Sequence, residues 1–252
     1  MILVFAGTKD GREIINSLLK QRYRLIASTA TEYGSSLLAN HPNLKKLKGK
    51  LNLADMKDLV KKEKVSIIID VTHPYAVEVS QNILQLSREL KIQTIRYERA
   101  SVKSDLIKEF NSYIEIINYL KHTKGNILLT IGANNLKLIT NSIDNSRLYA
   151  RILPLSSSLI KAEQAGLTAK QIIAVQGPCT IQFNGSMLEQ FNIKYLVTKD
   201  SGSEGGLYQK LEAAKYHNVE VLMLKRPQLP YPCVVDSLAE IMKKLRKGDI
   251  LC

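Results

Sequence analysis

The sequence has no tryptophan, few aromatic residues and only three cysteines, which lie far apart. Phe, Trp and Tyr make up 6% of the 252 residues, which leaves little surface on which nucleic-acid bases could stack. Cys179, Cys233 and Cys252 match neither the spacing of a metal-binding motif nor a disulfide framework. We therefore predict a protein without a bound metal, located in a reducing cytoplasm.

Long apolar runs are also missing from the chain. The longest, around Ile67–Ile69, is far shorter than the roughly 20 residues that cross a bilayer as a helix. The first residues, Met1–Gly7, have the pattern of a buried strand, and no basic segment precedes them. We therefore expect neither a signal peptide nor a membrane partner.

Positive charge is abundant, with a formal net charge of +13 that is spread over both halves of the chain. Such a surface can bind nucleic acid, or it can concentrate an anionic small molecule. The charge forms no basic tail and no arginine-rich helix, and stacking surface is scarce. This favours an acidic small molecule over nucleic acid, and a basic surface without a charged partner remains the third possibility.

Short apolar strands alternate with amphipathic helices along the whole chain. This alternation predicts an α/β protein with two Rossmann-like domains, mostly parallel sheets, helices on both faces, and the active cleft between the domains. We predict a nucleotide-binding domain at 1–98 and a second domain at 99–252. In the first domain we expect strands at 2–6, 24–29, 44–48, 66–71 and 93–97 and helices at 11–21, 34–40, 55–63 and 76–90. In the second we expect strands at 126–131, 147–152, 171–176, 195–199 and 219–224, a helix at 112–122 and a closing helix at 236–246.

Polar residues stand directly at the end of the predicted strand 66–71. They are Asp70, Thr72, His73 and Tyr75, and ligands of open α/β sheets bind just beyond the carboxyl ends of the strands. His73 can donate a proton near neutral pH, or it is a hydrogen-bonded structural histidine. Asp70 either takes part in the chemistry or caps the helix that follows.

A turn between the first strand and the first helix suits a phosphate group. Gly7 permits a tight turn before Thr8, and free N–H groups at a helix start point toward an anion. The full Gly-x-Gly-x-x-Gly fingerprint is absent, so a plain strand-to-helix turn remains the alternative. The second strand ends in Ser28 and Thr29 with no acid before Glu32, which leaves NADPH and NADH both open.

A second polar segment follows the predicted strand 195–199. Lys199, Asp200, Ser201 and Gly202 combine a cation, an acid and a hydroxyl group on one turn. These groups suit recognition of a carboxylate or an amide. A solvated loop with a helix cap is the alternative.

Several short motifs follow one another along nearly the whole chain. They are Gly7–Thr8 with Arg12, Asp70–Ala76 with Ser80, Arg96–Arg99, Leu129–Gly132, Ala150–Pro154, Gln176–Pro178 and Thr198–Gly202. In this order and spacing the chain resembles the precorrin-6A reductase family of corrin biosynthesis, which includes the cobalt-precorrin-6A reductases. One departure is Ala6, where relatives often carry a second glycine.

The resemblance implies a reductase of cobalamin biosynthesis. Such an enzyme transfers a hydride from NADPH or NADH to one double bond of precorrin-6A, or of its cobalt complex, and gives the 6B form. The nicotinamide supplies the hydride, so no catalytic metal is needed. A tetrapyrrole with many carboxylates would give the positive charge a role. We expect this substrate as the partner, no nucleic acid, and a monomer.

The resemblance also sorts the candidate site residues into groups. His73 and Asp70 are the candidate catalytic residues. The cofactor-binding candidates are Gly7, Thr8, Arg12, Ser28, Thr29 and Thr72. The substrate-binding candidates are Tyr75, Arg99, Arg151, Lys199, Asp200, Ser201 and Gly202. The alternative function is a non-catalytic nucleotide- or nucleic-acid-binding α/β protein, which salt-sensitive binding of oligonucleotides would identify.

Overall fold

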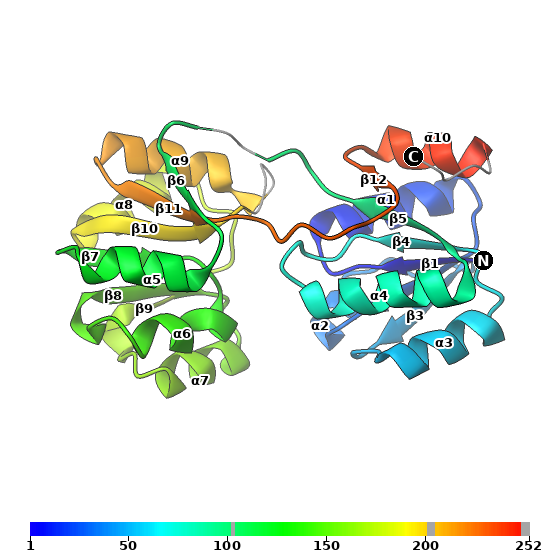
Figure 1. Cartoon of the computed structure of the whole chain (residues 1–252), viewed down its shortest axis with the longest axis horizontal. Helices are drawn as coiled ribbons and strands as arrows, with labels where there is room; N and C mark the ends of the chain where they lie inside the picture. The colour runs from blue at the N-terminus through cyan, green and yellow to red at the C-terminus, as the bar shows by residue number, and fades with distance from the viewer. Residues whose placement is uncertain (102–103, 201–204, 248–252) are drawn as a thin grey trace. The chain divides into compact units, whose positions relative to one another are not determined.

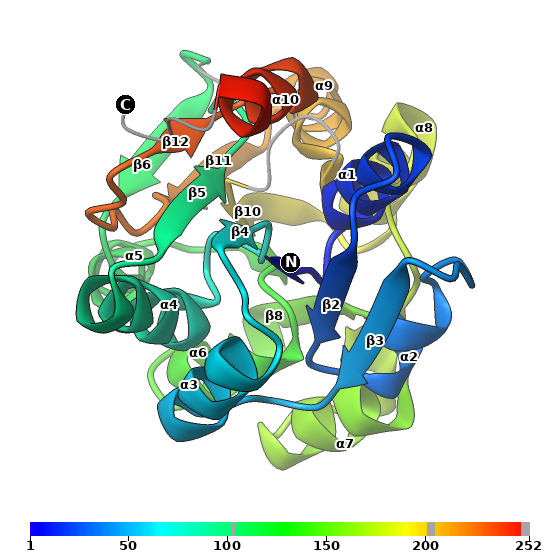
Figure 2. The same cartoon turned by 90° about the vertical axis from the view of Figure 1, so that its right-hand side faces the viewer.

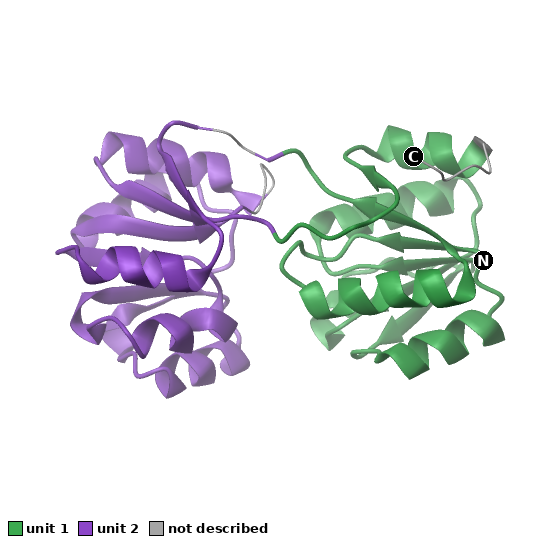
Figure 3. Ribbon diagram, viewed as in Figure 1, with its two compact units in different colours: residues 1–100, 227–252 green, residues 101–226 purple. Residues whose placement is uncertain are grey.

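The structure, a computed structural model, describes residues 1–101, 104–200 and 205–247 (Figure 1). The chain divides into two α/β units (Figure 3). Unit 1 comprises residues 1–100 and 227–252, and unit 2 comprises residues 101–226. Each unit contains a six-stranded sheet in which all the pairings are parallel. This confirms the predicted fold class, whereas the cleft that we expect between the domains stays a prediction.

The sheet of unit 1 has the strand order of dinucleotide-binding folds. Its strands run in the order β3 (Leu44–Lys48), β2 (Leu25–Thr29), β1 (Ile2–Phe5), β4 (Ile67–Asp70), β5 (Gln93–Tyr97) and β12 (Val234–Val235). Numbered along the sheet this is 3-2-1-4-5 plus a sixth strand. The order reverses between β1 and β4, and such a switch point is where dinucleotides bind.

Helices cover both faces of this sheet, which explains the continuous apolar run of β1. Ile2 and Val4 face α1 (Lys9–Lys20) and α10 (Leu238–Lys247). Leu3 and Phe5 face α3 (Leu53–Lys62) and α4 (Val77–Leu90) on the other side. A strand that is buried on both faces needs apolar residues at every position.

Unit 2 repeats this design. Its strands run in the order β9 (Ile172–Ala174), β8 (Leu148–Ile152), β7 (Asn126–Leu129), β10 (Ile193–Lys199), β11 (Glu220–Leu224) and β6 (Ile107–Phe110). One face is covered by α8 (Ile181–Gln190) and α9 (Leu207–Tyr216) and the other by α5 (Tyr113–Lys121), α6 (Leu136–Thr140) and α7 (Ser156–Gln164) (Figure 1).

The two units exchange their sixth strands. The strand β6 follows β5 in the sequence but pairs with β11 in unit 2. In return, β12 follows β11 but pairs with β5 in unit 1 (Figure 2). There Arg96 N donates to the carbonyl of Cys233 over 2.8 Å. The helix α10 then adds Ile241 and Met242 to the core of unit 1.

This exchange changes the expected domain limits. The chain leaves unit 1 after residue 100, close to the limit of 98 that we predict, but residues 227–252 belong to unit 1 and not to the second domain. The physical reason is length. Four residues in β6 and two in β12 are too short to give a readable alternation of apolar and polar residues.

Two smaller differences concern a helix and a cysteine. The expected helix 34–40 is α2 (Glu32–Ser36), which begins earlier because the Thr31 side chain accepts from Gly34 N over 3.0 Å. Cys233 is buried and disulfide-bonded, which the wide spacing of the cysteines did not predict. Cys179 is a free thiol. In the part of the chain that the structure describes, no helix combines the length and apolarity that crossing a bilayer requires.

Candidate active site

Three strand ends meet at the switch point of unit 1. In the registers of the sheet, Phe5 of β1 lies opposite Ser28 of β2 and opposite Asp70 of β4. Gly7 and Thr8 follow β1 after one residue, Ala6. The structure therefore brings the predicted cofactor residues of β1, β2 and β4 to one edge of this sheet.

The start of α1 forms a cradle that is open in front and tightly packed behind. Thr8 Oγ1 accepts from Gly11 N over 3.1 Å and donates to the carbonyl of Val71 over 3.2 Å. A Cβ atom on Gly11 would lie 3.0 Å from the Ala6 Cβ, so a larger residue would require Ala6 to shift by a few tenths of an ångström. A Cβ on Gly7 would meet no atom within 4 Å. The space beside Gly7, just before the start of the helix, is therefore open.

The other cofactor candidates lie around this cradle. Arg12 is half-buried on the first turn of α1, and its Nη1 donates to the Thr8 carbonyl over 3.4 Å. Ser28 and Thr29 are buried at the end of β2, and Thr29 Oγ1 donates to the Leu47 carbonyl over 3.4 Å. Their contacts with a cofactor stay predictions.

Asp70 lies at the centre of a buried hydrogen-bond network. Its carboxylate is fully buried and lies 2.8 Å from Nη1 of Arg96. It also accepts from Thr72 N over 2.9 Å and from Thr72 Oγ1 over 2.7 Å. Ser80 Oγ donates over 2.8 Å, and the Tyr231 hydroxyl completes the set. These donors fix the position and orientation of the carboxylate, which favours a positioning role over proton donation.

Two members of this network, Arg96 and Tyr231, were not predicted as site residues. Arg96 belongs to one of the motifs, but no role was predicted for it. In the structure its side chain is only 1% exposed. Its Nε also donates to Glu98 over 3.0 Å. Tyr231 comes from the segment that returns to unit 1, and no local pattern singles it out. Burial raises the pKa of the Tyr231 hydroxyl, and so does the neighbouring charge of Asp70.

His73 and Tyr75 form a pair beyond the end of β4. His73 is exposed, its Nδ1 accepts from Tyr75 N over 3.3 Å, and the two ring centroids are 5.5 Å apart. An exposed imidazole at the carboxyl edge of the sheet can reach a ligand. The roles of His73 and Tyr75 therefore stay open to test.

Arg99 lies beside the start of α1. Its guanidinium forms an ion pair with Asp10 in the first helical turn, and both side chains are mostly buried. Both residues belong to unit 1. Arg99 therefore ties the segment after β5 to the cradle, and its contact with substrate stays a prediction.

In unit 2, Asp200 is a buried anchor. Arg226 Nε lies 2.9 Å from its carboxylate and also donates to its carbonyl over 3.1 Å. Ser101 Oγ donates to the same carboxylate over 2.7 Å. Ser101 and Arg226 are the first and last residues of unit 2. Asp200 therefore binds the residue at which the chain enters unit 2 and the residue at which it leaves. This favours a structural role over the substrate contact that we predict.

The remaining substrate candidates differ in what the structure describes. Arg151 follows the middle of β8, and its Nη1 donates to Asn184 Oδ1 over 2.7 Å. Lys199 ends β10. Both are half-buried, and burial lowers the pKa of each cation. Ser201 and Gly202 lie outside the described residues.

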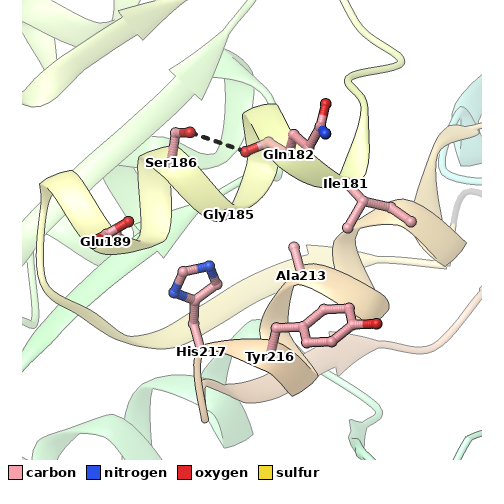
Figure 4. A pocket seen from close by; sticks show the side chains of 8 residues that line it. All are labelled: Ile181, Gln182, Gly185, Ser186, Glu189, Ala213, Tyr216 and His217. Atoms are coloured by element: carbon pink, nitrogen blue, oxygen red, sulfur yellow. Dashed lines mark hydrogen bonds between the residues drawn. The ribbon is translucent and has the colours of Figure 1, made fainter.

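A cavity of about 340 Å³ lies elsewhere, between α8 and α9 (Figure 4). It is lined by Ile181, Gln182, Gly185, Ser186, Glu189, Ala213, Tyr216 and His217. It contains no predicted site residue and lies in the helical layer of unit 2, away from the strand ends where ligands of α/β sheets bind. Among the residues described, no three His, Cys, Asp or Glu side chains gather as metal ligands would.

Comparisons with known proteins identify the family of this chain. The family model CbiJ, described as precorrin-6x reductase CbiJ/CobK, matches residues 1–246. A cobalt-precorrin-6A reductase of Priestia megaterium is 34% identical over 97% of this chain and 98% of its own length. Another, of Methanococcus maripaludis, is 32% identical over 97% of this chain and 98% of its own length.

A solved structure shows the same fold. The structure of CobK precorrin-6A reductase matches with a TM-score of 0.81 at 21% identity, and covers 99% of this chain and 98% of the other. The resemblance read from the motifs is thereby confirmed. The chain belongs to the precorrin-6x reductase family, CbiJ/CobK.

Proposed function

We propose that this chain reduces the cobalt complex of precorrin-6A to the 6B form, with a hydride from a nicotinamide nucleotide. The observation that carries the proposal is the match over nearly the full length to two relatives named cobalt-precorrin-6A reductase, each more than 30% identical. Because both names include cobalt, the cobalt-loaded ring is the preferred substrate and the metal-free ring is the competitor.

The residues of unit 1 fit a nicotinamide dinucleotide, which supplies the hydride when it is bound. The open cradle at Gly7 and the N–H groups at the start of α1 suit its diphosphate, and Arg12 adds positive charge. Glu32, the first acid after β2, lies 2.9 Å from Lys48. This pairing reduces repulsion of a ribose phosphate, so we propose that NADPH binds as well as NADH.

Two cations of unit 2 suit the carboxylates of the acidic ring. Burial disfavours the charged forms of Arg151 and Lys199, and a carboxylate placed against them would restore those forms. The reaction also needs a proton at the carbon next to the one that accepts the hydride. We assign this proton transfer to His73, because Asp70 is committed to its network.

A turnover assay tests the proposal. The protein is mixed with the metal-free or the cobalt-loaded ring and with NADPH or NADH in turn. We expect oxidation of the nucleotide and a product heavier by two hydrogens, fastest with the cobalt-loaded ring. No turnover in any of the combinations, together with salt-sensitive binding of oligonucleotides, would instead favour the nucleic-acid-binding alternative.

A further inference from the structure

A lysine is buried on the inner face of α9. Lys210 is only 6% exposed, and its Nζ donates to Thr198 Oγ1 on β10 over 3.3 Å. The buried residues Leu207, Leu211 and Ala214 lie on the same face, because residues three and four apart neighbour one another on a helix. Lys210 therefore points toward the carboxyl end of β10, where Thr198 lies.

Arg151 is the second cation in this region, and it is held in a fixed orientation. Its guanidinium donates to Asn184 Oδ1 over 2.7 Å. Asn184 is itself buried, and its Nδ2 donates to the carbonyls of Cys179 and Thr180 over 3.1 and 2.7 Å. The amide thus ties Arg151 to the start of α8. Asn184 has no charge with which to neutralise the guanidinium.

Arg151 and Lys210 lie on the same face of the sheet, at the carboxyl ends of β8 and β10, which β7 separates. Burial and the charge of Arg151 lower the pKa of Lys210 to about 7, while Cys179 acts in the opposite direction. In the described ranges, neither Lys210 nor Arg151 forms an ion pair with a carboxylate. Buried charges in proteins are normally paired, and an unpaired one indicates a missing ligand or a functional role.

We propose that Arg151 and Lys210 together bind one carboxylate group of the substrate, with Arg151 at the accessible end and Lys210 at the buried end. This inference rests on the proposed function and adds Lys210 to its substrate site. A guanidinium can offer two parallel hydrogen bonds to a carboxylate, and an ammonium adds a third donor. A phosphate of the cofactor has the same oxyanion chemistry, and the experiment distinguishes the two sources.

A carboxylate bound there would keep Lys210 protonated. The charged or titratable groups that act on Lys210 from the elements around it are Arg151 on β8 and Cys179 before α8. An anion between the cations raises the pKa of Lys210, so binding above neutral pH takes up a proton. At about pH 8 we expect close to one proton per ring bound, and affinity should fall about tenfold per pH unit as pH rises further.

Calorimetry with cobalt-precorrin-6A in two buffers of different ionisation enthalpy measures this uptake. The Lys210→Met variant keeps the apolar stem and removes the charge. We expect it to lose the proton uptake and to raise the Kd of the ring about tenfold. Lys215→Met, an exposed position on the same helix, should change neither quantity. NADPH affinity should be equal in all three proteins.

A second readout separates ligand binding from a structural role. Without ligand, Lys210→Met should melt at a higher temperature than the unmodified protein, because it removes an uncompensated buried charge. Citrate, a simple polycarboxylate, should raise the melting temperature of the unmodified protein more than that of the variant. This comparison does not depend on the ring being the substrate.

Several results would overturn the inference. One is that the unmodified protein takes up no proton when the ring binds. Another is that Lys210→Met binds the ring with unchanged affinity and melts at a lower temperature. A loss of NADPH affinity in that variant would assign the anion to the cofactor and not to the ring. Should Lys210→Met fail to fold, proton uptake by the unmodified protein still decides the matter. If the proposed function fails, turnover is absent in every combination, whereas the citrate effect can still be measured.

Discussion

The pairing of a buried charged side chain indicates whether the residue has a structural role or is a candidate for binding a ligand. Asp70 is paired with Arg96, and Asp200 is paired with Arg226. These acids lie where the sequence predicts them, directly at strand ends. Their partners could not be predicted, because the partners come from other strands and segments. We therefore propose that both acids act as positioning groups, a role that a pattern of strand ends cannot distinguish from a catalytic one.

Lys210 was missed although the sequence carries a signal for it. It has helical spacing to Leu207, Leu211 and Ala214, all of which are buried. A lysine on the apolar face of a helix is rare enough to deserve a search for its ligand. The sequence cannot show that Arg151, far away along the chain, acts on the same group.

Replacing Lys199 by Ala tests the substrate side of the proposal. We expect a KM for the tetrapyrrole about tenfold higher, because one charge-assisted contact worth about 1.4 kcal/mol is lost. The dissociation constant for the nucleotide should stay unchanged, since Lys199 belongs to unit 2. Steady-state kinetics and fluorescence titration measure the two quantities. If the affinity for the nucleotide falls instead, the division of binding between the units is wrong.

The pH dependence of stability should report the buried Lys210. Its pKa in the folded protein is about 7 and its ordinary value is 10.5. Between these values the unfolded chain binds more protons than the folded one, so this residue makes stability rise with pH. We expect its contribution to be on the order of 1 kcal/mol per pH unit. Urea unfolding at about pH 7 and about pH 9 should show a smaller slope in Lys210→Met, and an equal slope would refute the assignment.

At the scale of elements, patterns of burial made most of the fold predictable. Strands buried on both faces, such as β1 and β4, appear as apolar runs, and α4 shows helical spacing. The edge strands β6 and β12 were missed. They are held by backbone hydrogen bonds to a partner distant in sequence, such as that from Glu98 N to the carbonyl of Val235 over 2.9 Å, and such bonds leave no trace in local composition.

Gly7, before α1, and Gly11, in the first turn of α1, should respond differently to substitution. Gly11→Val would push a side chain against Ala6, whose Cβ lies 3.0 Å from the added Cβ position. We expect a loss of about 1–3 kcal/mol in unfolding free energy. Gly7→Ala meets no neighbouring atom within 4 Å, so stability should be kept while nucleotide affinity falls. Denaturant unfolding and titration with NADPH measure both effects. Unchanged affinity in Gly7→Ala would place the diphosphate elsewhere.

At the scale of the whole molecule, the exchange of sixth strands makes each unit depend on a distant part of the chain. Val235, Ile241 and Met242 belong to the same apolar cluster as Ile15 and Leu18 of α1. A single domain boundary in the sequence cannot describe this arrangement, because the short segment that returns to unit 1 comes after unit 2 in the chain.

Expression of residues 1–100 alone tests this dependence. We expect a fragment that does not melt cooperatively, because one face of its sheet loses the cover of α10. Coexpression with a peptide of residues 227–247 should restore a cooperative transition, and coexpression with residues 104–121 should not. Circular dichroism during heating is the measurement. A cooperative transition of residues 1–100 alone would show that the exchanged strand is dispensable.

The direct test of the central claim is the fate of the transferred hydrogen. The reduced nucleotide is labelled with deuterium at the transferable position of its dihydronicotinamide ring, and the product from cobalt-precorrin-6A is analysed by mass spectrometry. We predict a product that carries one deuterium from the nucleotide and one hydrogen from solvent. A reduced product without deuterium from either face of the nicotinamide, or no reduced product at all, would contradict it.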